Sequence, residues 1–316
     1  MSLSLAEHSP MLTSFKKPER YAGIILEHSH VTIVELTHNA AGYALTAAGS
    51  YESQMNFDNP SLFTGGDVRR HEKAFAGELG AALKQLGASA RRFSFGMNTE
   101  MLMLQTVPMD GSLDEQEQKG QAVWELRQFA DDATDTSHAL VTHRLASDDA
   151  RSVAPTVVVG VRKAFVAFLK NTAVQLKGVL HILDVQHFCA ENALRVNYPM
   201  LPELRTLMIG MDETALTAST IVDGATVDVQ VRPFTGDDTR MLYDFTRASG
   251  AEQIFLHGSA ASYHTCEALK RSLDIPVALI DPFKVVVLPA SLKGLADIKA
   301  RRHEFTAAVG LAMRTE

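Results

Sequence analysis

The sequence predicts an α/β protein made of two similar lobes. Three short strands with tight turns open the chain, and helices and strands then alternate. A second set of three strands, again followed by alternating helices and strands, fills the second half. With 316 residues the chain is long enough for two domains. Because such an internal repeat is the signature of a repeated structural unit, we expect two lobes with a cleft between them.

The first half begins with strands rich in β-branched residues, expected at 21–26, 31–36 and 43–51. The polar stretch EHSH separates the first two, and a hairpin turn is its favoured interpretation. At 67–86 apolar residues recur at helical spacing, and Gly87 ends the run as expected of a glycine after a helix.

Expected strands and helices continue to alternate up to the segment VNYPMLPEL, which is the predicted domain boundary. One helix is expected to begin near Ser112 and Glu115, a capping-box pair, and to reach about Ala130. It carries Trp124, expected with Phe129 to be a core residue. The remaining elements expected before the boundary are strands at 92–96, 101–107, 139–145, 156–161 and 179–185 and helices at 162–175 and up to 196.

The second half repeats the pattern. Val222, Asp223 and Gly224 predict a hairpin turn, because Asp-Gly suits the type I′ geometry. The chain is expected to finish in a helix over 303–314. The other expected elements are strands at 205–211, 214–222, 226–231 and 253–257, a short strand ending at 280, and helices at 237–248 and up to 273.

Composition excludes several classes of function. Hydrophobic residues make up 46% and charged residues 21%, and the net charge is −7 with no long run of Lys or Arg. Neither nucleic acid nor an anionic membrane surface is therefore an expected partner. No stretch approaches the roughly 20 apolar residues of a membrane span, and residues 1–20, an expected tail, lack a secretory signal. Cys189 and Cys266 are expected to be buried free thiols of a cytoplasmic protein.

Four stretches, in order along the chain, resemble the type IV pilus assembly protein PilM family of the actin-like superfamily: GIILEHSHVTIVEL, VWELRQF, IPVALIDPF and FTAAVGLAMR. The resemblance implies a two-lobed actin-like ATPase fold built from ribonuclease-H-like repeats. It also implies a first lobe at 21–196, with a small FtsA-like inserted subdomain at about 97–161. The second lobe would span 197–316, and its final helix would return to pack on the first lobe.

The same comparison implies a nucleotide cleft, but this chain departs from the family pattern there. Glu27 stands where the family has glycine in the first phosphate hairpin, and Ile25 where it has aspartate. In the second hairpin Gly210 replaces an aspartate and Asp212 a glycine, and HGSAAS keeps only Gly258 of a glycine triplet. We therefore expect a vestigial cleft with no catalytic residue, cofactor or metal. Its residues would be Glu27, His28, Ser29, His30, Asp212, Glu213, Thr214, Gly258 and Ser259.

Two other interpretations of these residues remain open. In an actin-like ATPase with unusual phosphate loops, Glu27, Asp212 and Glu213 would hold magnesium, while Thr214 and Gly258 would line phosphate and adenine. His28 and His30 alone are too few ligands for a metal site. Filament formation has no short sequence signature and stays a third possibility.

The resemblance implies a non-enzymatic scaffold of a type IV pilus or related secretion assembly. Its partner would be the cytoplasmic tail of a PilN-like inner-membrane protein, so the chain would reach the inner face of the inner membrane only through partners. The tail would lie in a groove between the first lobe and the inserted subdomain. Its oligomeric state is left open. Candidate groove residues on the insert are Leu102, Leu104, Val107, Val123, Trp124 and Leu126.

Overall fold

The computed structural model describes residues 19–40, 42–128, 134, 136–146, 153–234 and 239–315. Most of the expected tail 1–20 and Phe129 lie outside the described residues. Glu19 and Arg20, placed in the tail by the sequence, already belong to the first strand. Within the described part of the chain, no helix is both long and apolar enough to cross a bilayer.

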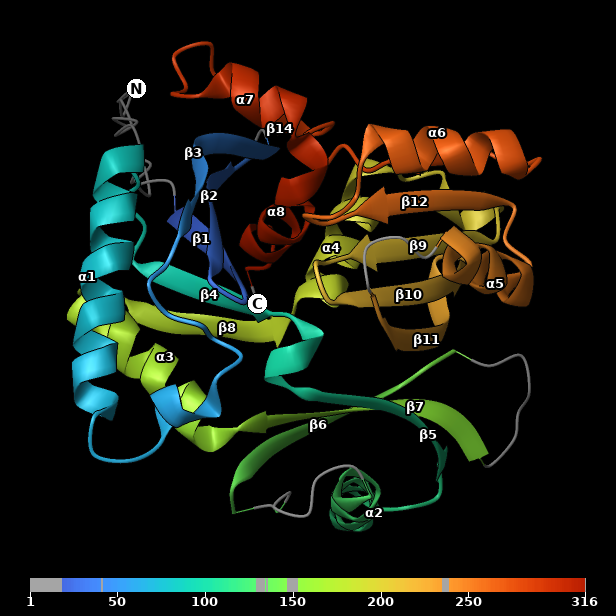
Figure 1. Cartoon of the computed structure of the whole chain (residues 1–316), viewed down its shortest axis with the longest axis horizontal. Coiled ribbons are helices and arrows are strands. Elements are labelled where there is room, and N and C mark those ends of the chain that lie inside the picture. The colour runs from blue at the N-terminus through green and yellow to red at the C-terminus, as the bar shows by residue number, and fades with distance from the viewer. Residues whose placement is uncertain are drawn as a thin grey trace, which may run out of the picture.

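The first lobe is built on a six-stranded sheet with the strand order β14-β3-β2-β1-β4-β8 (Figure 1). Strands β1, β2 and β3 form an antiparallel meander, whereas β4 and β8 run parallel to β1. The elements are β1 (Glu19–Glu27), β2 (His30–Asn39), β3 (Gly42–Glu52), α1 (Val68–Leu86), β4 (Arg92–Met97), α3 (Lys163–Gln175), β8 (Val179–Val185), α4 (Gln186–Asn197) and β14 (Val286–Val287).

Alternating side chains divide this sheet between two cores. Ile24 and Ile33 pack with α1 and α3 on one face, whereas Ile25 and Val34 pack with α4 and the last helix on the other. This alternation is what a strand with two buried faces requires, since successive side chains point to opposite sides. The helix expected at 67–86 is confirmed, and Gly87 closes it in the left-handed conformation with φ of 75°.

Residues between β4 and α3 form a separate three-stranded antiparallel sheet with the order β5-β7-β6. Helix α2 packs on the face of this sheet that points away from the rest of the molecule (Figure 1). The capping box of α2 is Asp114 with Glu117, so the predicted pair Ser112–Glu115 is wrong by two residues. The elements are β5 (Met103–Asp110), α2 (Glu115–Arg127), β6 (His138–Arg144) and β7 (Val153–Arg162).

The second lobe has a five-stranded sheet with the order β11-β10-β9-β12-β13. Asp223 and Gly224 have φ of 50° and 74°, which confirms the predicted turn between β10 and β11. The elements are β9 (Thr206–Met211), β10 (Ala215–Val222), β11 (Ala225–Pro233), α5 (Thr239–Ser249), β12 (Gln253–His257), α6 (Tyr263–Ser272), β13 (Val277–Leu279), α7 (Leu295–Ala300) and α8 (Thr306–Ala312).

The chain's last helix, α8, lies between the two lobes (Figure 1). It is shorter than the expected 303–314, because residues Arg302–Phe305 form a 3-10 turn before it. Every residue of α8 is buried, in a core that also contains Ile25 from the first sheet and Met208 from the second. Helix α8 therefore contacts β1 of the first lobe and shares its core with residues of the second lobe.

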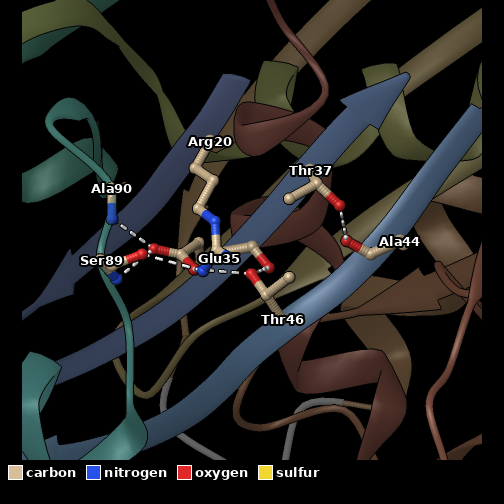
Figure 2. Close-up of polar contacts among 7 residues, drawn as sticks. All are labelled: Arg20, Glu35, Thr37, Ala44, Thr46, Ser89 and Ala90. Atoms are coloured by element: carbon tan, nitrogen blue, oxygen red, sulfur yellow. Dashed lines mark hydrogen bonds and ion pairs between the residues drawn. The ribbon is translucent and has the colours of Figure 1, made fainter. Parts of the chain in front are cut away.

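A buried carboxylate ties the first sheet to the segment that precedes β4. The Glu35 side chain is fully buried, and its Oε2 accepts hydrogen bonds from the backbone N–H groups of Ser89 and Ala90 at 2.6 and 2.5 Å (Figure 2). Its Oε1 accepts from the Thr46 hydroxyl at 2.6 Å and from Arg20 Nη1 at 3.1 Å. Four donors satisfy the carboxylate, which makes its burial tolerable. Both cysteines are free and buried, as predicted.

Two glycines allow α8 to approach its neighbours closely. A Cβ added at Gly310 would lie 1.9 Å from the carbonyl oxygen of Cys189 on α4. A Cβ added at Gly23 on β1 would lie 2.1 Å from the carbonyl oxygen of Ala308. Since both obstacles are backbone atoms, neither could move aside cheaply.

We predict that Gly310→Ala lowers the free energy of unfolding by about 1–3 kcal/mol, because the added methyl group forces α4 and α8 apart. Gly77→Ala is the matched control, since Gly77 lies inside α1 with open space around its Cα and alanine is the better helix former. The control should gain about 0.5–1 kcal/mol. Thermal and urea unfolding of the two variants measure the difference, and equal stability would contradict the prediction.

Candidate functional site

The cleft between the lobes is closed by a bridge of three polar side chains. Glu27 ends β1 in the first lobe, and Asp212 follows β9 in the second. Gln186, the first residue of α4, donates through Nε2 to Glu27 Oε1 and, at 3.3 Å, to Asp212 Oδ1. One amide group therefore joins the two hairpins that the resemblance assigns to phosphate binding.

Burial raises the pKa of both carboxyl groups in this bridge. For Glu27 the removal of water is the largest cause, opposed by hydrogen bonds from Gln186 and Ser259. For Asp212 the pKa lies well above its usual range, first because of burial and then because of the negative charge of Glu27. Each carboxyl group therefore holds its proton to a higher pH than it would in water.

Two neutral histidines fill the space beside Gly210. A Cβ at Gly210 would lie 2.8 Å from His257 Nε2 and 2.9 Å from His187 Nδ1. The two rings are 3.3 Å apart at these nitrogens, and His187 Nε2 pairs with the Ser219 hydroxyl at 2.7 Å. Burial lowers the pKa of His187 well below its usual range and that of His257 to about 3, so both stay neutral near pH 7. A side chain at position 210, including the aspartate of the family pattern, does not fit this arrangement.

The EHSH stretch is a hairpin turn, as favoured from the sequence. Glu27 pairs with His30 across it, and His28 takes a positive φ of 45°. The turn is fastened to the last residue of β3 and to the segment that follows it. His28 pairs with Asp58 at 2.8 Å, His30 pairs with Glu52 at 2.7 Å, and Ser29 donates to Glu52 at 3.0 Å. The two histidines thus contact different carboxylates.

The other predicted cleft residues surround the same place on the second lobe. Glu213 and Thr214 are exposed in the turn between β9 and β10, and Glu213 adds negative charge near Glu27 and Asp212. Gly258 follows β12 with φ of 103°, and a Cβ there would lie 2.4 Å from the carbonyl oxygen of Met211. Ser259 is exposed next to it and hydrogen-bonds to Glu27.

These residues do not fit a nucleoside triphosphate with magnesium. A phosphate cradle needs backbone N–H groups close to the anion and little negative charge, whereas here carboxylates from both lobes meet at the point where the hairpins converge. A cavity beside Gln186, His187 and Gly210 has a volume of about 10 Å³, room for about one water molecule. Within the described residues, no group of three or more His, Cys, Asp or Glu side chains is arranged to hold a metal ion.

A much larger groove lies between the three-stranded sheet and the body of the first lobe. Its volume is about 610 Å³, within the range of ligand-binding pockets. One wall is mostly aliphatic and comes from alternate residues of β6 and β7. The opposite wall comes from the end of β8, from α4 and from the residues after α8. The first wall includes Ala139, Val141, His143, Val157, Val159 and Val161, and the second includes Leu183, Val185, Phe188 and Asn192.

Two ion pairs also line the second wall. Arg195 pairs with Glu191 on α4, and Arg314 pairs with Asp184 at the end of β8. Arg195 also donates to the Thr226 hydroxyl at 3.0 Å, which links this end of the groove to the second lobe. Burial is the main cause that raises the pKa of Asp184, and the positive charge of Arg314 opposes it.

The six groove residues predicted from the sequence lie elsewhere on the inserted subdomain. Val107 and Leu126 are buried in the small core beneath α2. Leu104 is buried in a cluster that the insert shares with β8 and β11, next to the groove wall, and none of the six lines the 610 Å³ groove itself. Trp124 is 60% exposed on α2, so its expected place in the core is wrong. Leu102 and Val123 are partly buried. The groove is formed by the faces of β6 and β7 that point away from α2.

Sequence reasoning identified the two acids of the cleft but missed the groups that organise it. Gln186, His187 and His257 had no signal of their own, because each is a single polar residue at the end of an apolar strand or the start of a helix. Gly210, which stands where the family pattern has aspartate, was the available hint. A position without a side chain leaves space that other groups can fill.

No protein-family model matches this sequence, and no curated protein matches it. Solved structures match it well. A PilM–PilN type IV pilus biogenesis complex superposes with a TM-score of 0.71 at 17% identity, over 93% of this chain and 98% of that chain. A protein of unknown function from Bacteroides thetaiotaomicron with an actin-like ATPase fold superposes with a TM-score of 0.51 at 11% identity, over 86% of this chain and 95% of that one. The chain therefore has a two-lobed actin-like fold, and the predicted resemblance to PilM is confirmed for the fold.

Proposed function

We propose that this chain is a non-enzymatic scaffold of a type IV pilus or related secretion assembly, which binds a short segment of an inner-membrane partner. The groove of about 610 Å³ carries the proposal. The similarity in fold to a protein solved in a PilM–PilN complex supports a PilN-like partner. The chain would work at the inner face of the inner membrane, held there through this partner.

The shape of the groove favours an extended segment. Strand β8 is the edge strand of the first sheet, and among the described residues no strand pairs with its outer side, where a further strand could add. The aliphatic face of β6 and β7 lies opposite and offers contacts to alternate side chains of such a segment. A peptide that adds to a sheet edge gains affinity from main-chain hydrogen bonds and specificity from its side chains.

We also propose that the nucleotide site is degenerate, and the polar bridge across the interlobe cleft supports this. Gln186 joins Glu27 to Asp212 where phosphates would lie, and carboxylates without a metal repel them. An actin-like ATP-binding protein is the competing function, and it would require the Gln186 bridge to open.

We predict that millimolar ATP with magnesium leaves the thermal unfolding midpoint of the full chain unchanged. A ligand that binds only the folded state at a concentration a hundred times its Kd would add about 2.7 kcal/mol of stability, which is easily measured. A clear upward shift that Asp212→Ala removes would contradict the degenerate site and favour the ATP-binding alternative.

We predict that Asp212→Asn makes the protein more stable than wild type, by a margin that grows as pH rises. Because the folded pKa of Asp212 is raised, the wild type loses stability as pH increases through that value, while asparagine does not titrate. Asparagine can still accept the hydrogen bond from Gln186. The measurement is the unfolding midpoint against pH, with Asp223→Asn in the exposed β10–β11 turn as control. Parallel curves for Asp212→Asn and wild type would contradict a buried acid pair.

We predict that Val159→Asp weakens binding of the partner segment at least about tenfold, because it puts a charge on the aliphatic wall. Probes are synthetic peptides from the cytoplasmic tails of membrane proteins encoded next to this chain, titrated by fluorescence anisotropy. Val174→Asp is the control, since Val174 is exposed on α3 outside the groove. If Val159→Asp binds such a peptide as well as wild type does, the groove is not its site.

A further inference from the structure

A second pocket, separate from the groove, lies beside the outer edge of β3, at the end of the first sheet where the chain enters β1. Its volume is about 390 Å³, within the range of pockets that bind ligands. We propose that the apolar segment Met11–Phe15 of the same chain covers this pocket in an extended conformation. The segment would act within the first lobe, independently of any partner bound in the groove.

Three parts of the chain form the walls of this pocket. Strand β3 contributes Leu45–Ala48, the C-terminal end of α1 contributes Leu86 and Gly87, and the segment after β14 contributes Pro289, Ser291, Leu292 and Lys293. The side chains of Leu86 and Leu292 are only partly buried. An apolar occupant would therefore remove aliphatic surface from water, which favours its binding.

The outer edge of β3 is open along this pocket. Strand β14 pairs only with Tyr43 and Ala44, at the beginning of β3. From Leu45 to the end of β3, no strand among the described residues pairs with that edge. An unpaired edge presents backbone N–H and C=O groups to which a further extended segment can add. The pocket thus offers main-chain partners as well as apolar walls.

Arg20 fixes the point at which the chain enters the first sheet, and its side chain lines the pocket. Its Nη1 donates to Glu35 Oε1 at 3.1 Å and to the Ser89 hydroxyl at 2.8 Å (Figure 2). The residues that precede Glu19 therefore leave β1 next to the pocket. Phe15 is four residues before Glu19, a span of at most about 14 Å, so this side chain can reach the pocket.

The sequence before β1 has the composition that such an occupant needs. Between two prolines it reads MLTSFKK, with Met11, Leu12 and Phe15 as apolar side chains. Proline disfavours the helical conformation of the residue before it, so Pro18 favours an extended entry into β1. The two lysines follow Phe15 directly, and the nearby C-terminal end of α1 favours positive charge.

Attachment to the same chain favours this occupant over a second copy of the protein. A segment joined to the protein by a short linker has an effective concentration in the millimolar range, so weak contacts suffice to hold it. A second copy that met this edge about a twofold axis would bring its own Arg20 and Lys293 against the same two residues. Like charges at close range are repulsive.

The test is disulfide formation within the full chain, whose own two cysteines are buried. One variant combines Ser14→Cys with Ser291→Cys, at an exposed position in the pocket wall. The control combines Ser14→Cys with Val179→Cys, at a position that is 56% exposed. Val179 begins β8, two strands from β1 on one side, as β3 is two strands from β1 on the other. A segment with no preferred site would therefore reach both positions about equally.

We expect the effective concentration of the two thiols, measured in a glutathione redox buffer, to be about tenfold higher for the Ser291 pair than for the Val179 pair. Adding Phe15→Ser to both variants should remove this difference, because the largest apolar side chain of the segment is lost. Adding His8→Ser, outside the segment, should leave the difference unchanged.

Equal effective concentrations for the two pairs would overturn the proposal. So would a difference that Phe15→Ser leaves intact, since the apolar segment would then not be its cause. If the Ser291 variant forms disulfide-linked dimers instead of an internal disulfide, the segment covers the pocket of a second copy, and the proposed contact within one chain is wrong. None of these outcomes bears on the groove, which the Val159→Asp experiment tests separately.

Discussion

The close contact of α8 with β1 and α4 is the constraint on which the rest of this structure depends. Glycine at positions 23 and 310 lets backbone meet backbone, and the buried helix brings together residues from both sheets. Packing at this density leaves little freedom, since a single methyl group at either glycine would overlap a carbonyl oxygen. The two lobes are thereby joined by a continuous core instead of meeting only across a cleft.

Helix α4, held by this contact, carries side chains of both the cleft and the groove. Gln186 and His187, at its first turn, face the other lobe. Phe188, Glu191 and Arg195 follow at spacings of three and four residues, which places them along one side of a helix, and that side lines the groove. The position of α4 therefore sets the geometry of the groove wall and of the interlobe bridge at the same time.

The sequence predicted the architecture better than the sites, for a physical reason. Strands and helices are visible in local periodicity, and turns such as Asp223–Gly224 need a backbone conformation that few residues adopt. The acids Glu27 and Asp212 were found because they stand where the resembled family has glycine, in the two phosphate hairpins. The groove was missed because β7 carries apolar residues on both faces, with Val157 and Val159 on one and Ala154 and Val158 on the other, and local periodicity cannot tell which face packs on α2 and which lines a cavity. That choice is made by tertiary packing alone.

The Gln186 bridge between the lobes also affects the groove. If the two lobes moved relative to each other when a ligand bound, the position of α4 relative to the three-stranded sheet would change. Here Arg195 on α4 contacts Thr226 on β11, so one end of the groove is attached to the second lobe. With the lobes joined through α8 and bridged by Gln186, this end is held in place before any partner arrives. A preformed site loses less conformational freedom on binding, and more of its contact energy appears as affinity. The bridge between the two lobes and the fixed end of the groove are thus two effects of one packing arrangement.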